Sequence, residues 1–255
     1  MKQTALHLLA LTAVAATIFF TNLGQARLWD RDEPRNAGCA EEMMERGDLI
    51  VPIFNDELRH QKPVLLYWLM ISAYSMMGVS EFAARFWSAF LGLGSTLLTY
   101  GIARRLFNPT IALLSGVVVS CSLMFGVAAR AATPDSALIF FSTLGLFIYV
   151  AATFKPGTSG CELVSPGQWF PQNYWAVVLM NVAIALGVLT TGPVGLVLPT
   201  AIIGMFLLIQ RLPPLSEEFR KRQGRLSLGL LSILRTFNPV HFAKTCWSMR
   251  PITAI

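Results

Sequence analysis

A chain of 255 residues in which 54% are hydrophobic and only 13% are charged cannot cover its surface as a soluble protein does. The mean hydropathy of +0.56 indicates the same. The net charge is +6, and the four cysteines lack metal-ligand spacing, which argues against a disulfide framework and against a zinc site. The composition therefore indicates an integral membrane protein.

The apolar residues form long blocks along the chain. Most blocks approach the ~20 residues that a helix needs to cross ~30 Å of hydrocarbon. Helices satisfy their own backbone hydrogen bonds in lipid, so we expect an all-α polytopic membrane protein. The blocks are 4–23, 63–79, 85–103, 110–129, 134–153, 173–190 and 193–210.

The distribution of charge predicts which blocks cross the membrane. Residues 25–62 hold nine acids against six bases, whereas residues 211–250 hold eight bases and two acids. Basic segments near membrane ends stay in the cytoplasm. If block 63–79 lies at the outer interface without crossing, the basic tail and Arg104-Arg105 fall inside together. We therefore expect about six transmembrane helices in the cell (inner) membrane.

This topology divides the chain into two regions. Residues 1–210 are expected to form the transmembrane core, with a long extracytoplasmic first loop at 25–84 that contains interfacial helices. Residues 211–255 are expected to be a basic cytoplasmic tail that leads to a missing further span. The alternative for the first block is a cleaved signal peptide, because Gly24-Gln25-Ala26 resembles a cleavage site.

The first cluster of charge, Trp29–Arg35, follows the first span directly. In one interpretation Asp32 or Glu33 caps a helix that runs to about Arg46 and is stopped by Gly47. In the other interpretation the alternating charges hold an ionised carboxylate beside cations, as a general base facing a phosphate-bearing substrate requires.

Two further clusters lie on the same side of the membrane in this topology. Arg59 and Lys62 either extend their charges to the lipid boundary or bind a lipid phosphate. Asp135 either caps the fourth span or faces, with Arg130, the same cavity as the acidic loop. The turn at Thr191-Gly192-Pro193 joins the last two spans on this side.

Taken together, these segments resemble a known family. Trp29–Arg35, Gln61-Lys62-Pro63, Glu81-Phe-Ala-Ala-Arg85 and Arg130 to Asp135 occur in the order and spacing of the lipid-linked sugar transferases related to bacterial aminoarabinose transferase and the protein mannosyltransferases. The resemblance covers nearly the whole chain. It implies a GT-C fold, a polyprenyl-phosphate-linked sugar as donor, and a lipid or protein as acceptor.

The resemblance also assigns roles to individual residues. Asp32, within the Asp32-Glu33 pair, matches the catalytic aspartate, and Asp135 matches a second acidic position. Lys62 matches the lysine that contacts the donor phosphate, and Arg35 and Arg59 are expected to assist it. The proposed glycosyltransferase needs no nucleotide-sugar site, and the sequence has no glycine-rich phosphate loop. No nucleic acid is expected as a partner.

The sequence departs from the family in three respects. Gln61 stands where the family often has a glutamate that helps to bind metal or acceptor, so the need for a divalent metal is left open. Thr191 stands where the family often has a lysine. Family members are also about twice as long, so the chain corresponds to the N-terminal half.

These departures leave a second hypothesis open, in which the chain is a catalytically inactive remnant or a membrane-embedded binding subunit of such an enzyme. A transporter is disfavoured, because the predicted spans contain almost no central charge and no evident broken helix.

Overall fold

The computed structural model describes residues 2–29, 31–59, 62–156, 161–210, 240 and 243–245. Asp30, His60, Gln61 and nearly all of the predicted basic tail at 211–255 lie outside these residues. The described part is almost entirely helical, as predicted. Its one sheet is a two-stranded hairpin, β1 (Ile53–Phe54) paired antiparallel with β2 (Glu57–Leu58).

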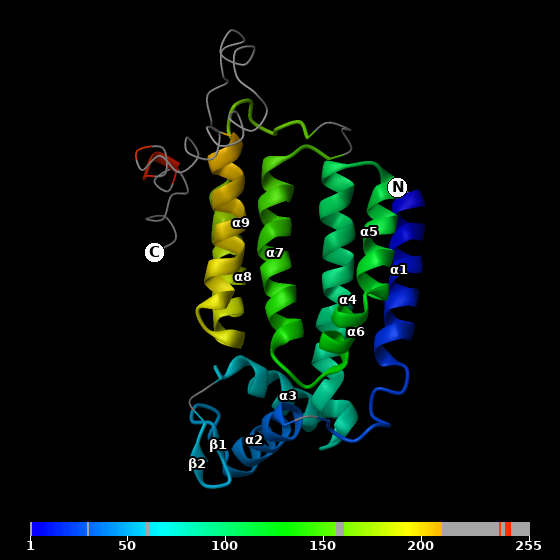
Figure 1. Ribbon diagram of the computed structural model, residues 1–255, viewed down its shortest axis with the longest axis vertical. Coiled ribbons are helices and arrows are strands. Elements are labelled where there is room, and N and C mark those ends of the chain that lie inside the picture. The colour runs from blue at the N-terminus through cyan, green and yellow to red at the C-terminus, as the bar shows by residue number, and fades with distance from the viewer. Residues whose placement is uncertain are drawn as a thin grey trace, which may run out of the picture.

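Long apolar helices stand side by side and form the body of the molecule (Figure 1). Four of them are long and apolar enough to cross a membrane, and the bent pair α5 and α6 makes a fifth crossing. The shorter apolar helix α9 has 17 residues and packs on α7 and α8, so the described residues contain four or five helices of spanning length against the six that the sequence predicts. The single helices are α1 (Lys2–Phe20), α4 (Glu81–Leu106), α7 (Asp135–Thr153), α8 (Tyr174–Thr191) and α9 (Val194–Gln210).

The first helix belongs to this body. Leu11, Ala15 and Phe19 on α1 are buried, and the helix packs on α4 and α5. Such packing favours a permanent membrane helix over the cleaved signal peptide considered above.

The third predicted span is broken. α5 (Pro109–Cys121) and α6 (Leu123–Arg130) meet at an angle of 63°. Ser122, between them, has an extended backbone with φ −68° and ψ 125°. The expectation that no span is broken was therefore wrong, because neither Pro nor Gly stands at this break to signal it.

The first loop carries its own small layer at one end of the bundle (Figure 1). α2 (Asp32–Arg46) ends at Gly47, whose left-handed φ of 68° stops the helix as predicted. α3 (Leu65–Met77) has only 13 residues, too few to cross ~30 Å of hydrocarbon. Tyr67, Met70 and Tyr74 bury one side of α3 among the α2 residues, so this block packs with the first loop, and its place at the interface stays a prediction.

The other connections are short or lie at the opposite end. The turns at α6–α7 and α8–α9 lie at the same end as the first loop, whereas the α4–α5 and α7–α8 connections lie at the far end (Figure 1). Gly192, with φ 82°, makes the tight α8–α9 turn. This arrangement agrees with the side assigned to each charged cluster.

Candidate active site

A cavity of about 1040 Å³ opens at the loop end of the bundle. One wall comes from the end of α1 and the first turn of α2, and the other comes from the α5–α6 break and the α6–α7 junction. Asp32 and Asp135 both line it, although 103 residues separate them, and Arg130 lines it with them. The expectation that Arg130 and Asp135 face the same cavity as the acidic loop is confirmed.

Asp32 is the first residue of α2 and is exposed. Arg31 occupies the N-cap position of α2, but no side chain makes a capping hydrogen bond at this helix start. Within the described residues, we find no hydrogen bond or ion pair to the Asp32 carboxylate. Its interpretation as a helix cap was therefore wrong, and its oxygens are open to the cavity.

Asp135 is likewise not a cap. It is the first residue of α7, after Pro134, and no side-chain capping bond forms at this helix start. Its Oδ2 accepts a hydrogen bond from the Thr133 hydroxyl at 3.0 Å. Thr133 also lines the cavity, so one exposed carboxylate and its hydroxyl partner face the space that Asp32 borders.

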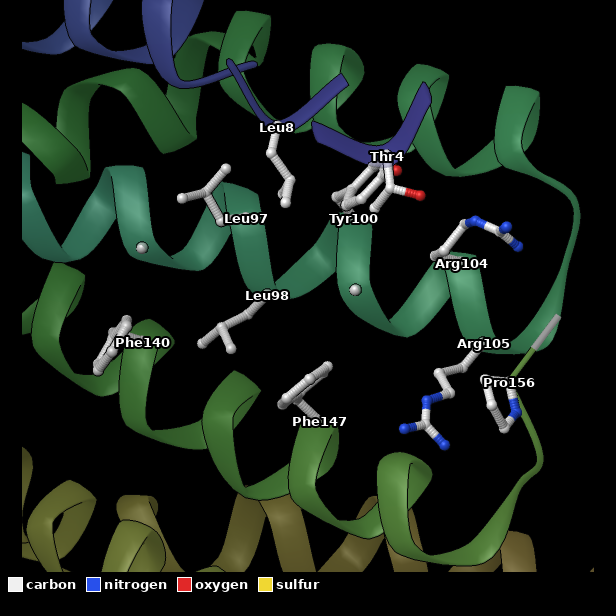
Figure 2. Close-up of a pocket in the computed structure, with 12 residues that line it drawn as sticks. Thr4, Leu8, Leu97, Leu98, Tyr100, Arg104, Arg105, Phe140, Phe147 and Pro156 are labelled. Carbon is white, nitrogen blue, oxygen red and sulfur yellow. The ribbon is translucent and has the colours of Figure 1, made fainter. Parts of the chain in front are cut away.

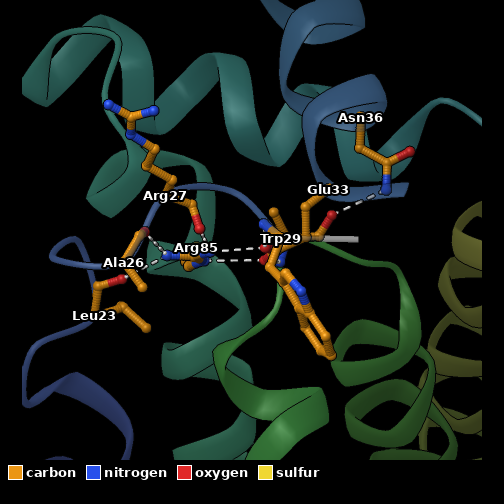
Figure 3. A network of polar contacts seen from close by, with 8 residues as sticks. Leu23, Ala26, Arg27, Trp29, Glu33, Asn36 and Arg85 are labelled. Carbon is orange, nitrogen blue, oxygen red and sulfur yellow. Dashed lines mark hydrogen bonds and ion pairs between the residues drawn. The ribbon is translucent and has the colours of Figure 1, made fainter. Parts of the chain in front are cut away.

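Glu33 lies next to Asp32 but has a different environment (Figure 3). It is buried, and its Oε1 accepts from Arg85 Nε at 2.9 Å and from the Ala132 amide at 2.6 Å. Its Oε2 accepts from Arg85 Nη2 at 2.7 Å and from the Trp29 amide at 2.7 Å. A carboxylate offers about four lone-pair positions, so Glu33 has none left for a reacting proton.

These contacts also fix the charge of Glu33. Burial by itself would raise the pKa of Glu33, but the hydrogen bonds from Arg85, Ala132 and Trp29 outweigh it and lower the pKa below its usual range. Glu33 therefore stays ionised in its buried pair with Arg85.

Arg85 is the centre of this network. Besides binding Glu33, it donates to the carbonyls of Leu23 at 3.0 Å, Ala26 at 2.7 Å and Arg27 at 3.0 Å. The whole guanidinium is thus used to tie the chain leaving α1 and the start of α2 to α4 (Figure 3). Sequence reasoning placed Arg85 in a family motif but did not find this role.

The three cations expected to bind phosphate do not line the cavity. Lys62 and Arg35 are half-buried, and we find no hydrogen bond or ion pair for either within the described residues. Arg59 donates from Nη2 to Asn36 Oδ1 at 2.8 Å, while its buried Nε has no partner. Asn36 in turn donates to the Ala132 carbonyl at 2.9 Å, which ties α2 to the α6–α7 junction.

The cations that do line the cavity are Arg85 and Arg130. All donors of Arg85 are used, whereas Arg130 makes one hydrogen bond among the described residues, from Nη1 to the Ile18 carbonyl at 2.6 Å. Sequence reasoning placed Arg130 at the cavity without giving it a role. Within the described residues, no three His, Cys, Asp or Glu side chains come together as metal ligands.

Comparison with known proteins matches most of the chain to one family. Residues 4–233 match the family model "Dolichyl-phosphate-mannose-protein mannosyltransferase". A protein of Aquifex aeolicus is 34% identical over 84% of the chain. The undecaprenyl phosphate-alpha-4-amino-4-deoxy-L-arabinose arabinosyl transferase of Erwinia tasmaniensis is 30% identical over 83% of the chain.

A solved structure has the same fold. The crystal structure of ArnT from Cupriavidus metallidurans bound to undecaprenyl phosphate superposes with a TM-score of 0.68 over 96% of the chain, at 24% identity. The match covers 42% of that structure, and the two sequence relatives are covered to 40% and 36% of their lengths. The chain therefore spans about two fifths of the length of the proteins that it matches.

Proposed function

The chain belongs to the dolichyl-phosphate-mannose-protein mannosyltransferase family, and we propose that it transfers a sugar from a polyprenyl phosphate to an acceptor at the outer face of the cell (inner) membrane. The observation that carries this proposal is the cavity at the loop end of the bundle, which Asp32 and Asp135 both line. The lipid delivers the activated sugar, and a cavity at the loop end of the bundle is open to donors that lie in the membrane.

The proposed reaction exchanges one bond at the anomeric carbon. The bond from this carbon to the phosphate oxygen breaks, and a bond from the acceptor oxygen forms. If the acceptor is a hydroxyl, Asp32 takes its proton, because its carboxylate has no partner among the described residues and faces the cavity. If the acceptor is a phosphate, no proton needs removal, and Asp32 positions it.

The leaving group is the polyprenyl phosphate, which gains negative charge as the bond breaks. A cation close to it lowers the barrier. The resemblance assigns this contact to Lys62, with Arg35 and Arg59, and Arg130 is a further cation at the cavity wall. The relative whose crystal structure holds undecaprenyl phosphate supports this class of donor.

Glu33 enters the proposal as a positioning residue. The hydrogen bonds that Glu33 accepts from Trp29, Ala132 and Arg85 hold the start of α2 in place. Asp32, the preceding residue, thereby points from a fixed helix start into the cavity. We propose that Glu33 itself exchanges no proton during the reaction.

The test is Asp32→Asn, introduced at the chromosomal locus so that everything around this chain is retained. Transfer of labelled sugar from a polyprenyl-phosphate donor is followed in membranes. We expect a loss of about 10²–10⁴-fold, the usual contribution of a general base. Expression and thermal unfolding should not change, since Asp32 makes no capping bond.

The matched control is Glu45→Gln, which neutralises an exposed carboxylate of the same helix outside the cavity. It should keep full transfer. Asp135→Asn should also reduce transfer, because Asp135 lines the same cavity. Transfer by Asp32→Asn at the rate of an active wild type would refute the catalytic assignment. A wild type that itself transfers no sugar would favour the inactive-remnant or binding-subunit alternative.

A further inference from the structure

A second cavity of about 750 Å³ lies between α1, α4 and α7, toward the end of the bundle opposite the first loop. Figure 2 shows its walls, with Leu8 on α1, Leu97 and Leu98 on α4, and Phe140 and Phe147 on α7. Arg104, Arg105 and Pro156 lie at one end of it. We refer to this feature as the far groove.

Two glycines shape the apolar part of the far groove. A side chain at Gly94 would meet Phe140 at 2.6 Å, and one at Gly101 would meet Phe147 at 2.7 Å. Both aromatic rings can therefore lie close against α4. The result is a smooth hydrocarbon channel between α4 and α7, not a polar site.

The far groove has the length of one lipid leaflet. It follows α4 from Gly94 to Arg104, and ten residues of helix rise ~15 Å. The hydrocarbon of one leaflet is half of ~30 Å, which is the same length. An acyl chain lying along the groove would therefore place its headgroup beside the arginines.

The arginine end has an uncompensated charge. Arg105 donates from Nη1 to the carbonyls of Ala151 at 2.9 Å and Phe154 at 2.8 Å, which ties α4 to α7. For the half-buried Arg104 we find no hydrogen bond or ion pair within the described residues. None of the twelve residues that line the groove is acidic.

One simpler account is that both arginines only offset the negative end of the α4 dipole. Their contacts among the described residues do not follow that pattern, because Arg105 donates to carbonyls of α7 and of its adjoining residue, whereas Arg104 donates to none. A guanidinium whose donors have no partner among the described residues, at the end of an apolar channel, instead matches a phosphate at the end of a hydrocarbon chain.

We propose that the far groove binds one anionic phospholipid of the leaflet opposite the first loop, with an acyl chain along Leu98, Phe140 and Phe147 and the phosphate at Arg104. This site is separate from the cavity that holds Asp32 and does not depend on the proposed reaction. Its function is to attach α1 to the α4–α7 pair through lipid at an end where these helices leave a gap.

The experiment is native mass spectrometry of the complete purified protein, titrated with phosphatidylglycerol or with phosphatidylcholine of the same acyl chains. The wild type should retain one tightly bound phosphatidylglycerol in preference to phosphatidylcholine. Arg104→Gln should weaken phosphatidylglycerol binding about tenfold, the effect of losing one hydrogen bond to a charged group. Arg104→Lys should recover part of this loss.

The matched control is Lys155→Gln. Lys155 is exposed at the same end, pairs with Glu162 at 3.5 Å and does not line the groove. Its loss should leave phosphatidylglycerol binding unchanged. Leu98→Trp should fill the channel and reduce binding of both lipids, with thermal unfolding measured to check that the variant folds.

Three results would overturn the proposal. The first is equal binding of the two lipids by the wild type. The second is an equal loss of phosphatidylglycerol binding in Arg104→Gln and Lys155→Gln. The third is that the complete protein retains no lipid because another helix fills the groove. If Leu98→Trp does not fold, the comparison of the two charge variants decides alone.

Discussion

Arg85 near the start of α4 and Glu33 in the first turn of α2 form a buried ion pair whose Nη2 and Oε2 atoms are 2.7 Å apart. Fifty-two residues separate them in sequence. Both side chains are about 6% exposed, so water screens neither charge. The pair therefore joins the loop that bears Asp32 to the membrane bundle.

Removing one member of this pair should be strongly destabilising. Glu33→Gln leaves the buried Arg85 cation without its counter-ion, and Arg85→Gln leaves the buried Glu33 carboxylate without its own. Either change should lower the free energy of unfolding by about 3–5 kcal/mol. Thermal unfolding in detergent should show the loss. Lys155→Gln breaks the exposed pair with Glu162 and should cost less than about 1 kcal/mol. Similar losses for both pairs would contradict the structural role of Glu33.

The same pair predicts a dependence of stability on pH. The folded pKa of Glu33 lies below the ordinary glutamate value of 4.5, so the unfolded chain binds the proton more tightly. The stabilisation is fully present above pH ~4.5 and is lost as the pH falls through the lower folded pKa. The unfolding temperature should therefore drop on acidification below pH ~5, and this drop should be smaller in Glu33→Gln. Parallel pH profiles would exclude Glu33 as the source.

A close contact between α4 and α6 gives a third prediction. A side chain at Gly92 would meet the Cβ of Ala129 at 2.6 Å, and Ala129 cannot rotate away. Gly92→Ala should therefore destabilise the protein by about 1–3 kcal/mol. Gly126→Ala is the control, since nothing lies within 4 Å of that position, and it should stabilise α6 by up to about 1 kcal/mol. Equal effects of the two substitutions would mean that α4 and α6 can move apart freely.

A fourth prediction concerns the donor phosphate. Lys62→Ala should weaken binding of a polyprenyl phosphate about tenfold, whereas Arg27→Ala should have little effect. Both substitutions remove one positive charge from the same loop, so a general electrostatic effect would reduce binding equally. Scintillation binding with a labelled polyprenyl phosphate measures both. Arg130→Gln, measured in the same binding assay, shows whether Arg130 at the cavity wall also contacts the phosphate.

A fifth prediction concerns orientation. With the native cysteines replaced, Glu45→Cys should react with an impermeant thiol reagent in intact cells, whereas Ser165→Cys should react only after the membrane is opened. Glu45 belongs to α2 and Ser165 to the α7–α8 connection, and these two segments lie at opposite ends of the bundle (Figure 1). Reaction of Ser165→Cys in intact cells would reverse the proposed sidedness.

Sequence patterns predicted the features that depend on local chemistry. Block length gave the membrane helices, and Gly47 gave the end of α2. Charge parity predicted that block 63–79 does not cross, and the 13 residues of α3 are consistent with this prediction. The length of a helix and the residue at which it ends depend on residues that are close in sequence, so composition and periodicity can predict them.

Features that depend on distant contacts were not predictable in this way. The contacts of Glu33 come from Arg85 and from the Ala132 amide, far along the chain, and no spacing rule connects them. The bend at Ser122 carries no Pro or Gly signal. The capping hypotheses for Asp32 and Asp135 failed because residue preference at a helix start does not reveal where a carboxylate points.

The hydrogen bond from the Ala132 amide to Glu33, across 99 residues of sequence, has a consequence for biogenesis. Ribosomes add roughly 5–20 residues per second, so the loop waits on the order of 5–20 seconds for its last partner. During that interval the Glu33 carboxylate lacks one of its donors. The contacts that fix the first loop are therefore complete only after the segment that joins α6 to α7 has been synthesised.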